Sequence, residues 1–114
     1  MVSLNHSVLT GRLTRDPEIR YTPKDEKPVA HFAIAVDRIG KNKDVDFINC
    51  VAWGGLAQIC GRYLKKGRLV AIEGRIQVNK YEAKNGEKKT SFEIIASNMQ
   101  MLDHKFNKAA EEAK

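Results

Sequence analysis

The feature that most restricts the fold of this sequence is a single change of hydrophobic periodicity in the middle of the chain. In most of the sequence apolar residues recur at every second position, as in strands that bury one face. In one segment the spacing becomes i, i+3, i+4, i+7 and i+8, over Leu56, Ile59, Cys60, Tyr63 and Leu64. A basic turn and a glycine follow this segment. The pattern predicts one short helix in a protein built of strands.

Turn-forming residues divide the remaining sequence into five predicted strands. Residues 29–36 and 45–53 form one predicted hairpin, and residues 68–81 and 90–102 form another around an Asn-Gly turn. The first strand, residues 7–13, continues briefly over residues 19–22 after Asp16-Pro17. We therefore predict an all-β, five-stranded OB-fold barrel, closed so that no edges are exposed, with one short helix between strands 3 and 4.

The length of 114 residues suits a single domain, which we place at residues 1–102. Residues 103–114 are formally neutral and have little apolar surface to bury, so we expect a short flexible tail. Cys50 and Cys60 lie within apolar patterns and are expected to be buried free thiols.

The chain carries a formal charge of +6, which favours a polyanionic partner, although a basic surface also serves solubility alone. No apolar run approaches the roughly 20 residues of a membrane span, and the N-terminus lacks the pattern of a signal peptide. We expect a soluble, cytoplasmic protein without a membrane partner.

Two predicted strands place aromatic and polar side chains on one sheet face. With Ile48, Cys50 and Ala52 inward, the outward side of residues 45–53 presents Phe47, Asn49 and Trp53. With Val70, Ile72, Ile76 and Val78 inward, the next strand presents Arg75, Gln77, Asn79 and Tyr81. Aromatic rings with cations between them suit single-stranded nucleic acid, because bases stack and phosphates need neutralising. The alternative is that these aromatics cover a second hydrophobic layer or a subunit interface.

Many cations lie in the predicted connections or near the first strand, where they could line a positive groove. Such clusters are otherwise solvated loops. The cations and the amide that we name as candidate phosphate or backbone contacts are Arg12, Arg20, Arg38, Asn49, Lys65, Lys66, Arg75, Lys80 and Lys89.

An enzyme is the main alternative to a binding protein. Asp16, Glu18, Asp37, Asp44 and Asp46 could suggest a metal-dependent nuclease, but acidic residues in turns usually cap the turn or are solvated. The three histidines are scattered, and no serine or cysteine stands in a recognisable nucleophile motif. We predict no catalytic residue, no metal site and no cofactor.

Several stretches resemble the bacterial single-stranded DNA-binding protein (SSB) family over most of residues 1–102. These stretches are VLTGRLTRDPEIRYTP, VAHFAIAV, DFINCVAWGGLAQICGRYLKKGRLVAIEGRI and ASNMQML. The resemblance implies a homotetramer of OB-folds that coats and protects single-stranded DNA in replication, recombination and repair, without catalysis and in association with the nucleoid. It also implies that Phe47, Trp53 and Tyr81 stack on bases, and that Arg20, Lys65, Lys66, Lys80 and Lys89 contact phosphates.

The sequence departs from the family pattern in two places. Arg38-Ile39-Gly40 stands where relatives often have a further aromatic that stacks on a base. We therefore expect that stacking position to be absent or replaced by Arg38. The sequence ends in EEAK instead of an acidic tip containing Pro-Phe, so recruitment of replication and repair proteins through that tip is not predicted. An OB-fold interaction protein of the primosome, or an RNA-binding relative, remains the alternative within this fold.

Overall fold

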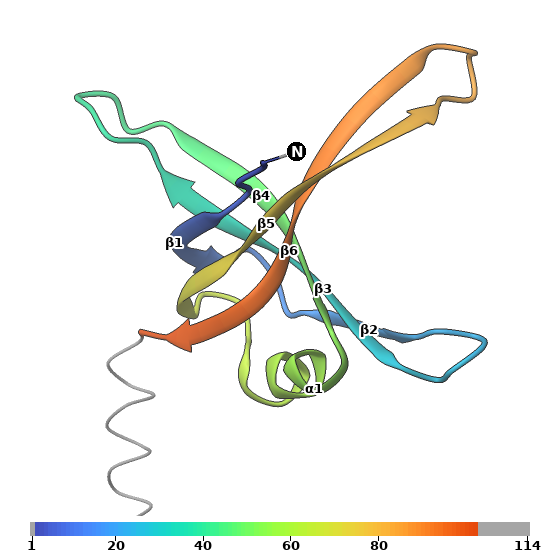
Figure 1. Cartoon of the computed structure of the whole chain (residues 1–114). Coiled ribbons are helices and arrows are strands. Elements are labelled where there is room, and N and C mark those ends of the chain that lie inside the picture. Colours follow the sequence, from blue (N-terminus) through green and yellow to red (C-terminus); the bar gives the residue numbers. More distant parts are fainter. Residues whose placement is uncertain (1, 103–114) are drawn as a thin grey trace, which may run out of the picture.

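The computed structural model describes residues 2–102, which form a closed barrel of strands with one helix at its end (Figure 1). The β3–β4 and β5–β6 hairpins project from the opposite end (Figure 1). Within the described residues no helix has both the length and the apolar character needed to cross a bilayer. The elements in chain order are β1 (Ser7–Leu13), β2 (Glu18–Tyr21), β3 (Pro28–Asp37), β4 (Val45–Trp53), α1 (Gly54–Tyr63), β5 (Leu69–Glu82) and β6 (Lys88–Met101).

Five of these strands form the ring, in the order β1-β5-β6-β4-β3, and β1 closes it by pairing with β3. All neighbours are antiparallel except β4 and β6, which run parallel and pair only at Cys50–Ile94 and Val51–Ile95. The predicted five-stranded OB-fold barrel is confirmed. The helix predicted between strands 3 and 4 follows the expected strand, residues 45–53, but lies between β4 and β5, because the chain has one strand more than predicted. The predicted tail, residues 103–114, lies outside the described residues.

One predicted boundary within the barrel was wrong. The short continuation after Asp16-Pro17 is a separate strand, β2, which pairs with β3 from Glu18–His31 to Tyr21–Pro28. It is a strand of its own because the turn at residues 14–17 redirects the chain onto β3, on the far side from β4. The chain therefore has six strands, and α1 lies between β4 and β5.

The helix follows β4 without a connecting loop. Gly54, immediately after Trp53, has φ of +61°, a conformation that glycine adopts readily, and α1 begins there instead of at Leu56. Ala57 and Cys60 are buried, whereas Ile59 and Tyr63 are 45% and 39% exposed. The helix is therefore oriented so that these smaller side chains lie against the sheet.

The core is formed by the inward positions of the strands and by α1. Ala30, Phe32 and Ile34 of β3 are buried. Cys50 and Cys60 are buried free thiols, as predicted, and burial raises the pKa of Cys50 to about 12 and that of Cys60 to about 11. Both sulfur atoms therefore remain protonated at neutral pH and act as small apolar groups.

The inward face of β5 is buried only within the barrel. Val70 and Ile72 are fully buried, but Ile76 and Val78 are 42% and 56% exposed, so their predicted burial was wrong. Beyond Gly74 the β5–β6 hairpin extends past the barrel (Figure 1), so the side chains at 76 and 78 are only partly covered. Phe92 of β6 pairs with Val78 on the same face and is also exposed. An apolar patch of Ile76, Val78 and Phe92 results.

Two glycines allow the strands to approach closely where the barrel bends. A Cβ atom at Gly11 would collide with the carbonyl oxygen of Ala35, and one at Gly74 would collide with that of Ile95. Gly11 precedes the two residues of β1 that pair with β3, and Gly74 lies at the shift of register between β5 and β6. Closure of the barrel therefore depends on the missing side chains at these positions.

We expect Gly74→Ala to lower the free energy of unfolding by about 1–3 kcal/mol, because the added methyl group overlaps main-chain atoms that cannot rotate away. Gly55→Ala is the matched control, since nothing lies within 4 Å of its Cβ position in α1. That control should be neutral or stabilising by up to about 1 kcal/mol. Urea denaturation measures both changes. Equal stabilities of the two variants would contradict the role of Gly74 in the bend.

Candidate nucleic-acid interface

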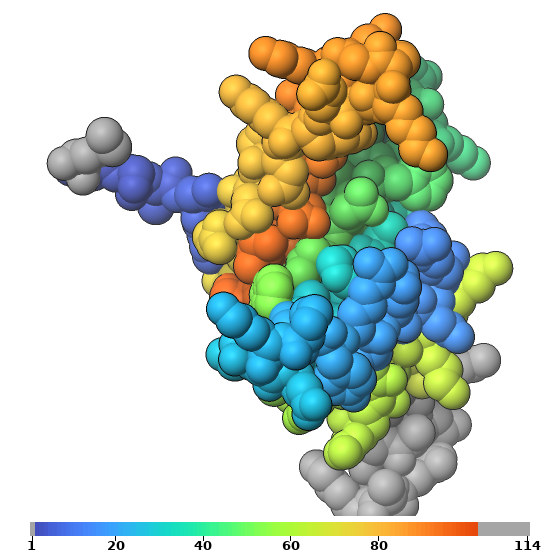
Figure 2. All heavy atoms as spheres, turned by 90° about the vertical axis from the view of Figure 1, so that its right-hand side faces the viewer, coloured from blue at the N-terminus to red at the C-terminus, as the bar shows by residue number. Residues whose placement is uncertain are grey.

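A groove of about 460 Å³ crosses the outer face of five strands. Strand pairing places Glu18, His31, Val51, Ile95 and Arg75 in one continuous row across β2, β3, β4, β6 and β5. In Figure 2 this face is seen with the β5–β6 hairpin above and the β2–β3 segment below. The described lining residues are Arg20, Tyr21, Thr22, Pro23, Val29, His31, Val51, Trp53, Arg75, Gln77, Glu93 and Ile95.

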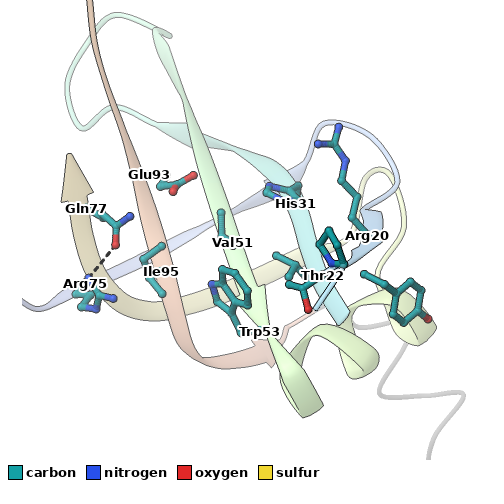
Figure 3. A pocket seen from close by; sticks show the side chains of 12 residues that line it. Arg20, Thr22, His31, Val51, Trp53, Arg75, Gln77, Glu93 and Ile95 are labelled. Carbon is teal, nitrogen blue, oxygen red and sulfur yellow. Dashed lines mark hydrogen bonds between the residues drawn. The ribbon is translucent and has the colours of Figure 1, made fainter. Parts of the chain in front are cut away.

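Trp53 is the aromatic residue of the predicted set that lines this groove. It is the last residue of β4, on the outward side, and is 50% exposed. Its ring lies beside Val51 and Ile95, which form the apolar floor (Figure 3). The turn at Gly54 carries the chain away from the sheet directly after the ring. Half of the indole surface is thus left for a flat ligand to contact.

Phe47 and Tyr81 lie on the same side of the sheet but outside the groove. Phe47 is 70% exposed and stands opposite Ala35 on the β3–β4 hairpin, six residues or about 20 Å along β4 from Trp53. Tyr81 is 51% exposed and stands opposite Lys89 on the β5–β6 hairpin. The three predicted aromatics therefore lie in different places. Phe47 is on the β3–β4 hairpin, Tyr81 is on the β5–β6 hairpin, and Trp53 is in the groove.

Two of the predicted cations border the groove from opposite ends of its row. Arg20 extends from β2, and its guanidinium donates a hydrogen bond to the Glu18 carboxylate at 2.8 Å. This bond and the charge of Arg20 lower the pKa of Glu18. Arg75 lies on β5, where its Nη1 donates to Gln77 Oε1 at 3.2 Å (Figure 3).

The other predicted contacts lie outside the groove. Asn49 lines an adjoining hollow of about 250 Å³, together with Arg15, Glu18 and His31. Lys80 and Lys89 flank Tyr81 in a shallow hollow of the β5–β6 hairpin. The lysine side chains at 65 and 66 are exposed in the loop after α1, away from the groove.

Arg12 and Arg38 interact with other groups of the protein. Arg12 Nη1 donates to the carbonyl oxygen of Gly67 at 3.0 Å. Arg38 donates two hydrogen bonds to Asp46 Oδ1, at 2.8 and 3.0 Å, across the β3–β4 hairpin. The bonds lower the pKa of Asp46 and raise that of Arg38. A phosphate bound at Arg38 would have to compete with this carboxylate.

Three of the acidic residues considered for a nuclease site have partners within the protein. Glu18 pairs with Arg20, Asp46 pairs with Arg38, and the Asp16 carboxylate accepts a hydrogen bond from the Lys66 main-chain N–H at 2.8 Å. Within residues 2–102 no three His, Cys, Asp or Glu side chains gather closely enough to hold a metal ion.

Tyr21, His31 and Glu93 are among the groove residues that were not named as candidates from the sequence. His31 and Glu93 lie on the outward side of their strands, so the alternation of inward and outward positions could have identified them as surface residues. Their place in the groove depends on which strands are neighbours, and the parallel pairing of β4 with β6 has no sequence signal.

Comparison with known proteins gives the family of this chain. Residues 4–102 match the single-strand binding protein family. The chain is 45% identical over 104 residues to single-stranded DNA-binding protein 1 of Lactococcus lactis, covering 88% of this chain and 69% of the relative. It is 44% identical over 110 residues to single-stranded DNA-binding protein 1 of Streptococcus pyogenes, covering 93% and 84%. The match extends through the whole barrel, and the chain belongs to the single-strand binding protein family.

Proposed function

We propose that this chain binds single-stranded DNA and so coats and protects it during replication, recombination and repair. The observation that carries the proposal is the groove in which Trp53 lies between Arg20 and Arg75. Such a groove offers a stacking surface to bases and positive charge to phosphates, without a requirement for sequence. The names of the relatives support the same ligand.

The proposed contacts follow from exposure and position. Trp53 stacks on a base in the groove, and Phe47 and Tyr81 extend the stacking surface along the two hairpins. Arg20 and Arg75 contact the backbone at the groove, and Lys80 and Lys89 do so beside Tyr81. The path continues past Asn49 and Arg38, and around the barrel past Arg12, Lys65 and Lys66. No step is catalytic, and the site of action is the nucleoid in the cytoplasm.

The proposed ligand is tested by competition between single-stranded DNA, duplex DNA and RNA of equal length. We expect single-stranded DNA to displace the other two. A clear preference for RNA or duplex would favour an RNA-binding or primosomal OB-fold protein instead.

We expect Trp53→Ala to weaken oligo-dT binding by roughly 1–3 kcal/mol, the effect of one stacked base. Because Trp53 is the single tryptophan, binding to the wild type should also quench its fluorescence. The loss of folding stability should be smaller than the roughly 3–5 kcal/mol of a fully buried ring, since half of this ring is exposed. Tyr63→Ala is the control, because Tyr63 is an exposed aromatic on α1 outside the groove. Equal affinity of wild type and Trp53→Ala would remove Trp53 from the DNA path.

Binding should weaken steeply with salt, because each phosphate contact releases counterions and contributes a slope of about −0.7 in log K against log salt. Replacing both Lys65 and Lys66 by Ala should lower the affinity and make this slope shallower by up to about 1.4. Titrations at four or more salt concentrations give the slope. If the slope of the double variant equals that of the wild type, the DNA does not pass these lysines.

We also propose that the chain forms a homotetramer. The patch of Ile76, Val78 and Phe92 leaves apolar surface in water that self-association would cover. Light scattering should give about four times the chain mass of 12.8 kDa. Val78→Lys should reduce that mass, whereas Ser91→Lys, on the opposite face of the hairpin, should not. A wild-type monomer at micromolar concentration would contradict the proposal.

A further inference from the structure

The groove contains a carboxylate that binding of phosphates does not explain. Glu93 is the acidic residue among the described residues that line it, and it also lines the adjoining hollow. It extends from β6 between Gln77 and Val51 (Figure 3). Among residues 2–102 the structure contains no salt bridge to Glu93. A phosphate placed against this carboxylate would be repelled, so Glu93 must face another part of the ligand.

A chain of hydrogen bonds fixes how Glu93 is held. Arg75 Nη1 donates to Gln77 Oε1 at 3.2 Å, Gln77 Nε2 donates to Asn79 Oδ1 at 3.3 Å, and Asn79 Nδ2 donates to Glu93 Oε1 at 3.2 Å. A guanidinium can only donate and a carboxylate only accept, so the two ends determine the orientation of both amides. Oε1 is thereby engaged. Among the described residues no group donates to Oε2, which remains an acceptor for a ligand.

The floor beside Glu93 is suited to a base. Val51 and Ile95 are paired on neighbouring parallel strands, with Trp53 two residues beyond Val51 and Glu93 two residues before Ile95. Trp53 and Glu93 are therefore about four residue rises, or about 13 Å, apart along the strands. That span leaves room for one flat ring on the apolar floor, with indole at one side and carboxylate at the other.

We propose that Glu93 reads the edge of a base that lies on this floor, next to the base stacked on Trp53. The inference rests on the proposed function, since it assigns base selectivity to the same groove. A carboxylate accepts readily from the N4 amino group of cytosine. Thymine has a carbonyl oxygen at that position, and its one N–H lies between two carbonyls that face the carboxylate unfavourably. The groove should therefore favour cytosine over thymine at this position.

The test compares oligo-dC with oligo-dT of equal length at pH 7.5, using the wild type and Glu93→Gln. The variant removes the charge but keeps the shape of the side chain. We expect the dC-to-dT affinity ratio to fall about threefold to tenfold in Glu93→Gln, in line with loss of a charge-assisted hydrogen bond. The matched control is Glu73→Gln, which removes the same charge from β5 beside His6, outside the groove, and should leave the ratio unchanged.

A second variant tests the orientation of the carboxylate. Asn79→Ala removes the donor to Oε1 and should lower the same ratio by a smaller factor, and it carries the test if Glu93→Gln does not fold. If Glu93→Gln changes the affinity for dC and dT by the same factor, Glu93 acts by charge alone and the inference is wrong. If the wild type binds neither oligonucleotide, the proposed function falls and the inference falls with it.

Discussion

The architecture depends on a contact of only two residue pairs, Arg12–Ala35 and Leu13–Ile34, through which β1 reaches β3. Without this contact the strands would form an open sheet with β1 and β2 at its two edges. Closure curves the sheet around one core. It also means that β1 pairs with both β5 and β3. The absence of a side chain at Gly11 lets the backbones approach at this corner.

The same curvature shapes the groove. Arg20 on β2 and Arg75 on β5 are separated by three strands, yet both border one cavity. Charges of both signs are present there, since Arg20 is paired with Glu18 and the amides of β5 lead from Arg75 to Glu93. The surface is therefore not a uniformly positive trough. Its cations are held in fixed directions by neutral or acidic partners, which limits the rearrangement needed when a ligand arrives.

Alternation of side chains was enough to predict much of this structure. It placed Phe47 and Trp53 outside and Cys50 and Ala52 inside, and the helical spacing gave α1 to within two residues of its start. It failed for Ile76 and Val78, because alternation tells which side a residue takes but not where the covering layer ends. Alternation also could not place His31 and Glu93 in the groove. Which residues are neighbours across β4 and β6 is set by the closure of the whole barrel and not by any local pattern. The sequence resemblance supplied the ligand class, which periodicity alone left open.

The two-pair parallel contact between β4 and β6 has a consequence for how the molecule opens. It joins the β3–β4 hairpin to the β5–β6 hairpin, each of which is paired internally over many more residues. This joint is the natural hinge along which the barrel would part in a partial unfolding event. Val51 and Ile95, the floor of the groove, belong to this joint. A strand of DNA lying across the floor would span the hinge and hold the two hairpins together, so occupancy of the groove and integrity of the barrel would be thermodynamically linked.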